Sequence, residues 1–147
     1  MKLNKKKIVI TSAVRTAVGT FGGSLKKMQG QDLGSIVVKE AIRKSKLKPN
    51  DVDELIMGQV LTGAAGQNPA RQAAIQAGLP ISKTAYVINQ VCGSGLRSVP
   101  AGYQAIMSDD SQIVIAGGQE GQSRLDNHLD QQKMGLRFLR PIRFSML

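Results

Sequence analysis

The single cysteine of the chain lies where an apolar, strand-like run gives way to a helical pattern. Residues 84–89 concentrate β-branched and aromatic types, which is typical of a short buried strand. After Cys92, apolar residues recur at helical spacing, at Leu96, Val99, Tyr103 and Ile106. Cys92 is therefore predicted to lie at a helix N-terminus, where unpaired N–H groups and the helix dipole favour thiolate over thiol. Gly93 and Gly95 leave room for a ligand to approach the sulfur.

Two interpretations of this cysteine compete. A lone cysteine is most often a small buried apolar residue with no chemical role. The neighbours of Cys92 favour the reactive interpretation, because residues 89–98 read NQVCGSGLRS and resemble the nucleophile motif of the thiolase family, in particular its acetyl-CoA acetyltransferases. A ten-residue match is specific, whereas the pair Cys-Gly alone would not be.

The resemblance extends to four other segments of the chain. Residues 10–19 (ITSAVRTAVG) are similar to the opening strand and loop of thiolases, and residues 51–60 (DVDELIMGQV) to the second strand. Residues 66–74 (GQNPARQAA) resemble the start of the second helix, and residues 115–120 (IAGGQE) the fourth strand. The resemblance implies a thiolase N-terminal domain over residues 1–120, followed by a divergent, poorly ordered tail over residues 121–147 that resembles a frameshifted remnant.

Strand-like runs alternate with helical patterns, which predicts an α/β fold with a mixed, mostly parallel sheet flanked by helices. The resemblance implies that this is the fold of the thiolase N-terminal half, here incomplete. The predicted strands cover residues 7–13, 54–61, 84–91 and 112–116.

Three helices are predicted between and after these strands. The first has Asp32 as its N-cap and ends before Pro49, with a core stripe of Leu33, Ile36, Val37 and Ala41. The second covers residues 68–78, with Pro69 in its first turn and Gly78 as its C-cap. The third follows Cys92 and contains Pro100, which costs a helix interior about 3 kcal/mol or a kink.

Composition limits the cellular location and the classes of binding partner that we expect. One cysteine excludes an intrachain disulfide and agrees with a reducing, cytoplasmic location, and no apolar run reaches the ~20 residues that span a bilayer, so no membrane partner is expected. Twenty Lys and Arg oppose ten Asp and Glu, but two Tyr, three Phe and no Trp cannot build a stacking platform for single-stranded nucleic acid. We expect no nucleic-acid partner, and the positive potential would equally attract the phosphates of coenzyme A.

The resemblance implies thioester chemistry typical of acetyl-CoA C-acetyltransferases and of fatty acid metabolism. Cys92 would attack an acyl-CoA, hold the acyl group, and pass it to a second acetyl-CoA or back to coenzyme A. Coenzyme A thioesters would be substrates, with no further cofactor and no metal, and the chain would form a homo-oligomer. The alternative is a truncated, non-catalytic fragment that acts at most as an association module.

Other polar residues receive smaller roles. Thiolases carry their histidine base and second cysteine in Gly-His-Pro and Cys-x-Gly-Gly-Gly motifs, neither of which occurs in these 147 residues. The only histidine, His128, matches no catalytic pattern and is expected in a solvated loop. Arg71 and Gln72 are expected in helix packing or a subunit contact, Asn89 in satisfying backbone groups, and Gly117–Gly118 at a closely packed strand end.

Overall fold

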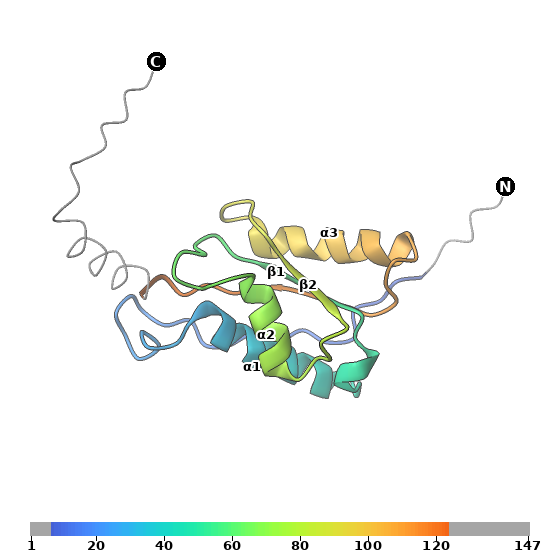
Figure 1. Cartoon of the computed structure of the whole chain (residues 1–147), viewed down its shortest axis with the longest axis horizontal. Helices are drawn as coiled ribbons and strands as arrows, with labels where there is room; N and C mark the ends of the chain where they lie inside the picture. Colours follow the sequence, from blue (N-terminus) through green and yellow to red (C-terminus); the bar gives the residue numbers. More distant parts are fainter. Residues whose placement is uncertain (1–6, 124–147) are drawn as a thin grey trace, which may run out of the picture.

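The computed structural model describes residues 7–123 and shows a three-stranded parallel sheet with helices on both faces (Figure 1). In chain order the elements are α1 (Gly30–Lys44), the 3₁₀ turn η1 (Pro49–Asp51), β1 (Glu54–Gly58), α2 (Pro69–Ala77), β2 (Thr84–Ile88), α3 (Ser94–Met107) and β3 (Val114–Gly118). The strand order is β2-β1-β3, and Glu54 is in register with Thr84 and Val114. The predicted α/β class with a parallel sheet is confirmed.

Two of the sequence predictions fall largely outside the described residues. Of the predicted tail over residues 121–147, residues 124–147 are not described, and His128 is among them.

The predicted strand over residues 7–13 is wrong, because residues 7–20 carry no strand. A strand needs a neighbour whose backbone groups face it. Residues 8–20 and the edge strand β3 instead both line a cavity of about 890 Å³. Side chains attach the segment to the end of α1, since Ser12 Oγ donates to the Ala41 carbonyl at 3.1 Å and Thr11 Oγ1 lies 2.9 Å from Ser45 Oγ.

The three observed strands are each shorter than predicted or shifted, and side chains explain where the ladders stop. Beyond Gly58, the N–H groups of Val60 and Leu61 donate to the Glu120 carboxylate rather than to a strand. Before Val114, a carboxylate receives the N–H groups of residues 112 and 113 in the same way. The apolar runs therefore predicted where the three strands lie but not the residues at which they begin and end.

The first helix begins earlier than predicted, and the predicted core stripe is only partly confirmed: Val37 packs against the core, and Leu33 and Ala41 are half-buried. Asp32 is inside the helix, and its Oδ2 accepts the N–H of Gln29 at 2.8 Å. Ile36 is 47% exposed, whereas Val38 and Ile42 are buried. A small residue lies where α1 meets α2, since a Cβ added at Gly34 would lie 1.9 Å from Gln119 Oε1 and 3.3 Å from the Cβ of Ala73.

The predicted boundaries of α2 are confirmed. Asn68 Oδ1 accepts the N–H of Arg71 at 3.1 Å, and Gly78 ends the helix with a φ of 93°, which favours glycine. The Arg71 guanidinium donates to the Ile81 and Lys83 carbonyls. Arg71 therefore ties the helix to the turn that leads into β2.

The strands separate two differently packed layers. Leu55 and Met57 face α1 and α2 and belong to the main apolar core, so alternation places Ile56 and Gly58 on the side of α3. Helix α3 buries only small residues, which are Ser94, Ser98 and Gly102, and continues through the exposed Pro100. Its Leu96 is 78% exposed. Helix α3 therefore lies close to the sheet and turns its large apolar residues outward.

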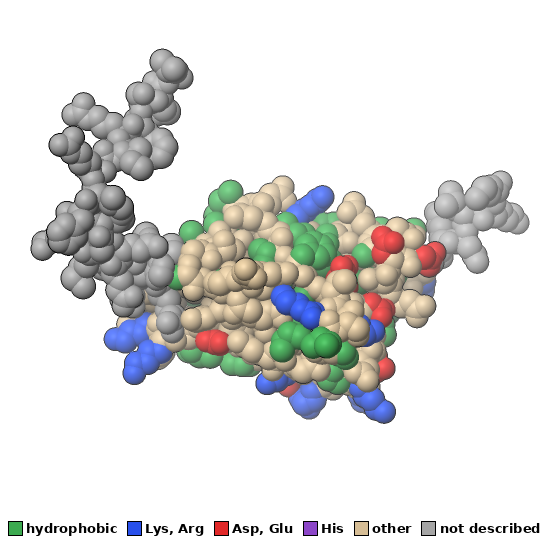
Figure 2. Space-filling model, viewed as in Figure 1, with side chains coloured by type: hydrophobic (Ala, Val, Ile, Leu, Met, Phe, Trp, Pro, Cys, Tyr) green, Lys and Arg blue, Asp and Glu red, His purple; other side chains and the backbone are tan. Residues whose placement is uncertain are grey.

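The charged side chains are dispersed over the visible face (Figure 2), and the helices are short or polar. Figure 2 shows Lys and Arg spread over several elements of the visible face, with Asp and Glu among them. Within residues 7–123, no helix combines the length and the apolar character that a membrane span requires.

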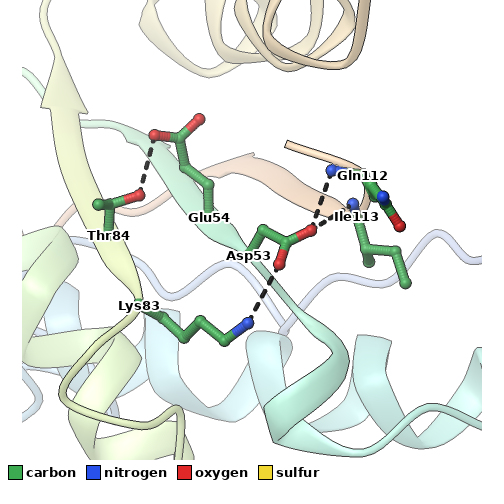
Figure 3. A network of polar contacts seen from close by, with 6 residues as sticks. All are labelled: Asp53, Glu54, Lys83, Thr84, Gln112 and Ile113. Atoms are coloured by element: carbon green, nitrogen blue, oxygen red, sulfur yellow. Dashed lines mark hydrogen bonds and ion pairs between the residues drawn. The ribbon is translucent and has the colours of Figure 1, made fainter. Parts of the chain in front are cut away.

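Asp53 joins the starting ends of all three strands (Figure 3). Its Oδ2 accepts the N–H groups of Gln112 at 2.9 Å and Ile113 at 3.1 Å, and its Oδ1 lies 3.1 Å from Lys83 Nζ. The N–H of Gln112, with that of Ile113 and the Lys83 ammonium, holds the pKa of Asp53 below its ordinary value against the opposing effect of partial burial.

We expect Gly58→Ala to lower the free energy of unfolding by about 2 kcal/mol or more, because the new Cβ would meet the Ser94 carbonyl carbon at 2.2 Å. Gly117→Ala is the matched control on the neighbouring strand. Its Cβ would meet Met57 Sδ at an ordinary 3.6 Å, and we expect a loss below about 1 kcal/mol. Urea unfolding of both variants measures the difference, and equal losses would contradict the close contact.

We expect Asp53→Asn to destabilise the chain at neutral pH and much less in acid. A folded-state pKa below the unfolded value stabilises the fold above about pH 4, and that contribution disappears as the pH falls below it. Thermal unfolding of both proteins between about pH 7 and pH 3 checks this. A difference in Tm that stays constant over the range would rule out the charge of Asp53 as its cause.

Candidate active site

Cys92 is exposed and has a free thiol, and it directly precedes Gly93, the N-cap of α3. The loop of residues 89–93 connects the end of β2 to this helix. The predicted placement of Cys92 at a strand-to-helix junction is confirmed. The alternative of a small buried apolar residue is wrong in its burial, because Cys92 is exposed.

The residue before the cysteine has an unfavourable backbone conformation. Val91 has a φ of 50°, in the left-handed region that β-branched residues avoid. Such a conformation costs about 1–3 kcal/mol and persists only where the surroundings impose it. The strain is adjacent to the sulfur, so the contacts that hold Val91 also fix Cys92.

Ser94 supplies two of these contacts. It is buried, and its Oγ accepts the N–H of Gln90 at 2.8 Å and donates to the Val91 carbonyl at 2.6 Å. The Ser94 N–H also donates to the Val91 carbonyl, at 3.1 Å. Sequence reasoning missed this role, although the signal was present as a hydroxyl residue between the two glycines that follow the cysteine.

Asn89 supplies a third contact and links the loop to a neighbouring one. Its Oδ1 accepts the N–H of Val91 at 3.1 Å, and its Nδ2 donates to the Val60 carbonyl at 3.1 Å. The prediction that Asn89 satisfies backbone groups is confirmed.

Glycines set the depth at which the helix lies. A Cβ at Gly118 would lie 3.1 Å from the Cα of Gly95, and one at Gly58 would overlap the backbone of Ser94 and Gly95. The predicted close packing at the strand end is confirmed for Gly118. The start of α3 therefore rests on the carboxyl ends of β1 and β3, where loops of parallel sheets commonly bind ligands.

Other predicted residues lie away from the sulfur or serve the scaffold. Gln72 Nε2 donates to the carbonyls of Ala65 and Gln67 at 2.6 and 3.0 Å, so it holds the loop before α2. Cys92 is not among the residues that line the cavity beside β3. In the described part of the chain, no group of three or more His, Cys, Asp or Glu could hold a metal ion.

The arrangement suits nucleophilic attack on a molecule that arrives from solvent. The thiol is exposed, its backbone is held by the contacts of Ser94 and Asn89, and it lies next to the N-terminus of α3, which is the positive end of the helix dipole. A thiolate in this place would form a covalent adduct and release it again, because sulfur is both a good nucleophile and a good leaving group.

We expect Ser94→Ala to loosen the loop of residues 89–93, because the Gln90 N–H loses its acceptor, at a cost of about 1–3 kcal/mol. Ser98→Ala is the matched control one turn later. Ser98 is equally buried, but its Oγ donates only to the Gly95 carbonyl of its own helix, at 2.7 Å. Hydrogen exchange should rise at residues 90–93 in Ser94→Ala and stay unchanged there in Ser98→Ala; the same exchange in both variants would contradict the role of Ser94.

The chain is similar to known proteins over most of its length. The family model described as "Thiolase, N-terminal domain" matches residues 8–140. An acetyl-CoA acetyltransferase of Cupriavidus necator is 54% identical over 130 residues, which are 88% of this chain and 33% of the relative. A probable acetyl-CoA acetyltransferase of Escherichia coli is 49% identical with the same coverage. The chain thus spans about a third of the length of the curated relatives it matches.

A solved structure supports the same assignment. The crystal structure of the Bacillus anthracis acetyl-CoA acetyltransferase matches with a TM-score of 0.72 and 39% identity, over 75% of this chain and 28% of that one. The family model covers far more than half of the chain and includes the loop that carries Cys92. The chain therefore belongs to the thiolase family and matches its N-terminal domain.

Proposed function

We propose that Cys92 is the acyl-accepting nucleophile of a thiolase-type acetyl-CoA C-acetyltransferase. The observation that carries this proposal is the exposed thiol on a strained loop at the start of α3, held by Ser94 and Asn89 and lying within the residues that match the family. The relatives named acetyl-CoA acetyltransferase support acetyl-CoA as the substrate.

The reaction follows from the chemistry of a thiolate. The Cys92 sulfur attacks the carbonyl carbon of the acyl-CoA, the bond between that carbon and the coenzyme A sulfur breaks, and coenzyme A leaves as a thiol after taking up a proton. The acyl group on Cys92 then passes to the carbanion of a second acetyl-CoA, or returns to coenzyme A. The acyl group and the thiol that accepts it come from the coenzyme A substrates and Cys92, so the proposal includes no further cofactor.

The 147 residues hold only part of the groups that condensation requires. Deprotonating the cysteine and the α-carbon of the second acetyl-CoA needs acid–base groups, each worth about 10²–10⁴-fold in rate. The chain has one cysteine and one histidine. We infer that Cys92 in this chain accepts an acyl group slowly and that the condensation step depends on groups outside these residues.

The proposal also includes a cellular location and an oligomeric state. A reducing, cytoplasmic environment keeps the single thiol free for acylation. A homo-oligomer is in keeping with the exposed apolar residues of α3, of which Val99 and Tyr103 are 43% and 52% exposed.

We expect acetyl-CoA to transfer one acetyl group slowly onto Cys92, as measured by intact mass and peptide mapping, and Cys92→Ser to prevent transfer to that peptide. Formation or cleavage of acetoacetyl-CoA should fall at least about 10⁴-fold below that of a complete thiolase, because two acid–base groups are missing and each is worth at least about 10²-fold.

Two results would overturn this account. Unlabelled Cys92 at saturating acetyl-CoA would favour the alternative of a non-catalytic association module. Turnover within a hundredfold of a complete thiolase, abolished by Cys92→Ser, would show that these residues suffice for condensation.

A further inference from the structure

Glu120 fixes the segment that leaves β1. It lies two residues after the end of β3 and is half-buried. Its Oε2 accepts the N–H of Val60 at 2.8 Å, and its Oε1 accepts the N–H of Leu61 at 3.2 Å. One carboxylate thus receives two consecutive backbone donors at the point where β1 has ended.

The same segment contacts the loop of the nucleophile. The Val60 carbonyl accepts Asn89 Nδ2 at 3.1 Å, and Asn89 Oδ1 accepts the N–H of Val91 at 3.1 Å. Val91 holds the strained φ of 50° and is bonded to Cys92. A continuous series of hydrogen bonds and peptide units therefore leads from the Glu120 carboxylate to the residue that carries the thiol.

We propose that Glu120 is a positioning residue for Cys92, acting through residues 60–61 and Asn89. This rests on the proposed function only in taking Cys92 as the nucleophile. A carboxylate fits the task because its two oxygens accept both N–H groups at once in charge-assisted bonds. A glutamine has a single acceptor oxygen, so Glu120→Gln releases at least one of the two donors.

The chain contains a matched control for this role. Asp53 also accepts two consecutive backbone N–H groups, and it also joins β1 to β3. It does so at the opposite end of the strand pair, before Glu54, whereas the loop of residues 89–93 follows the carboxyl end of β2. Asp53→Asn therefore weakens a comparable pair of hydrogen bonds between β1 and β3 without acting on the loop of residues 89–93.

The first experiment compares Glu120→Gln with Asp53→Asn in the 147-residue chain. We expect Glu120→Gln to raise hydrogen exchange at residues 60–61 and at 89–93, and to lower the rate of Cys92 acylation by acetyl-CoA about tenfold or more, since small misplacements of reacting groups carry such costs. Asp53→Asn should raise exchange at residues 112–113 and leave both the loop and the acylation rate unchanged.

A spectroscopic measurement separates positioning from general stability. The single cysteine takes one trifluoroacetonyl label, whose fluorine resonance reports the surroundings of the sulfur. We expect Glu120→Gln to shift or broaden this resonance and Asp53→Asn to leave it in place. A resonance that moves equally in both variants would overturn the proposal.

Asn89→Asp tests the link between the two loops directly and is an exposed, mild change. It keeps the acceptor for the Val91 N–H but removes the donor to the Val60 carbonyl. Because both variants act through one link, the double variant should be acylated no more slowly than the slower single variant.

Three results would overturn the positioning role. The first is an additive loss of acylation rate in the double variant. The second is hydrogen exchange in Glu120→Gln that rises at residues 60–61 but not at 89–93. The third is unchanged exchange at residues 60–61 in Asn89→Asp, and this result remains decisive even if Glu120→Gln does not fold. Absent acylation of the parent chain would refute the proposed function alone, since the exchange and fluorine measurements do not depend on it.

Discussion

The contact between the start of α3 and the ends of two strands is the constraint on which the site depends. Gly58 and Gly118 touch the helix backbone so closely that a Cβ at Gly58 would lie 2.2 Å from the Ser94 carbonyl carbon. The helix therefore begins directly over the sheet, and the chain must travel from β2 to that point within residues 89–93. The left-handed Val91 follows from this short connection, and the exposed Cys92 comes next.

Features with local causes could be predicted from the sequence. Asn68 and Gly78 bound α2 as expected, because capping residues act within one turn of the chain. The junction at Cys92 was equally predictable, since the change from strand-like to helical periodicity lies within a few residues. The parallel sheet followed from alternating element types, and the motif around Cys92 indicated the family that the comparisons then established.

Features that depend on distant partners could not be predicted. Periodicity shows that α1 and α3 are helices, but their small residues decide which side meets a neighbour, so Ile36 and Leu96 lie exposed. The run over residues 7–13 has the composition of a strand, yet no strand forms there, and this segment and β3 both line one cavity. Glu120 acts on Val60, 60 positions away, and no local pattern marks such a pair.

Because the strands are short, the carboxylates that accept backbone N–H groups at their ends contribute more to holding β1 and β3 together. Each strand here has five residues, so the ladder holds β1 and β3 together over a short distance only. Asp53 closes one end of this pair and Glu120 the other, and each satisfies two backbone donors that the ladder leaves free. The end at Glu120 also borders the loop of Cys92. A strained Val91 costs about 1–3 kcal/mol, and it is retained there because Ser94, Asn89 and the fixed segment beside them leave the loop no relaxed alternative.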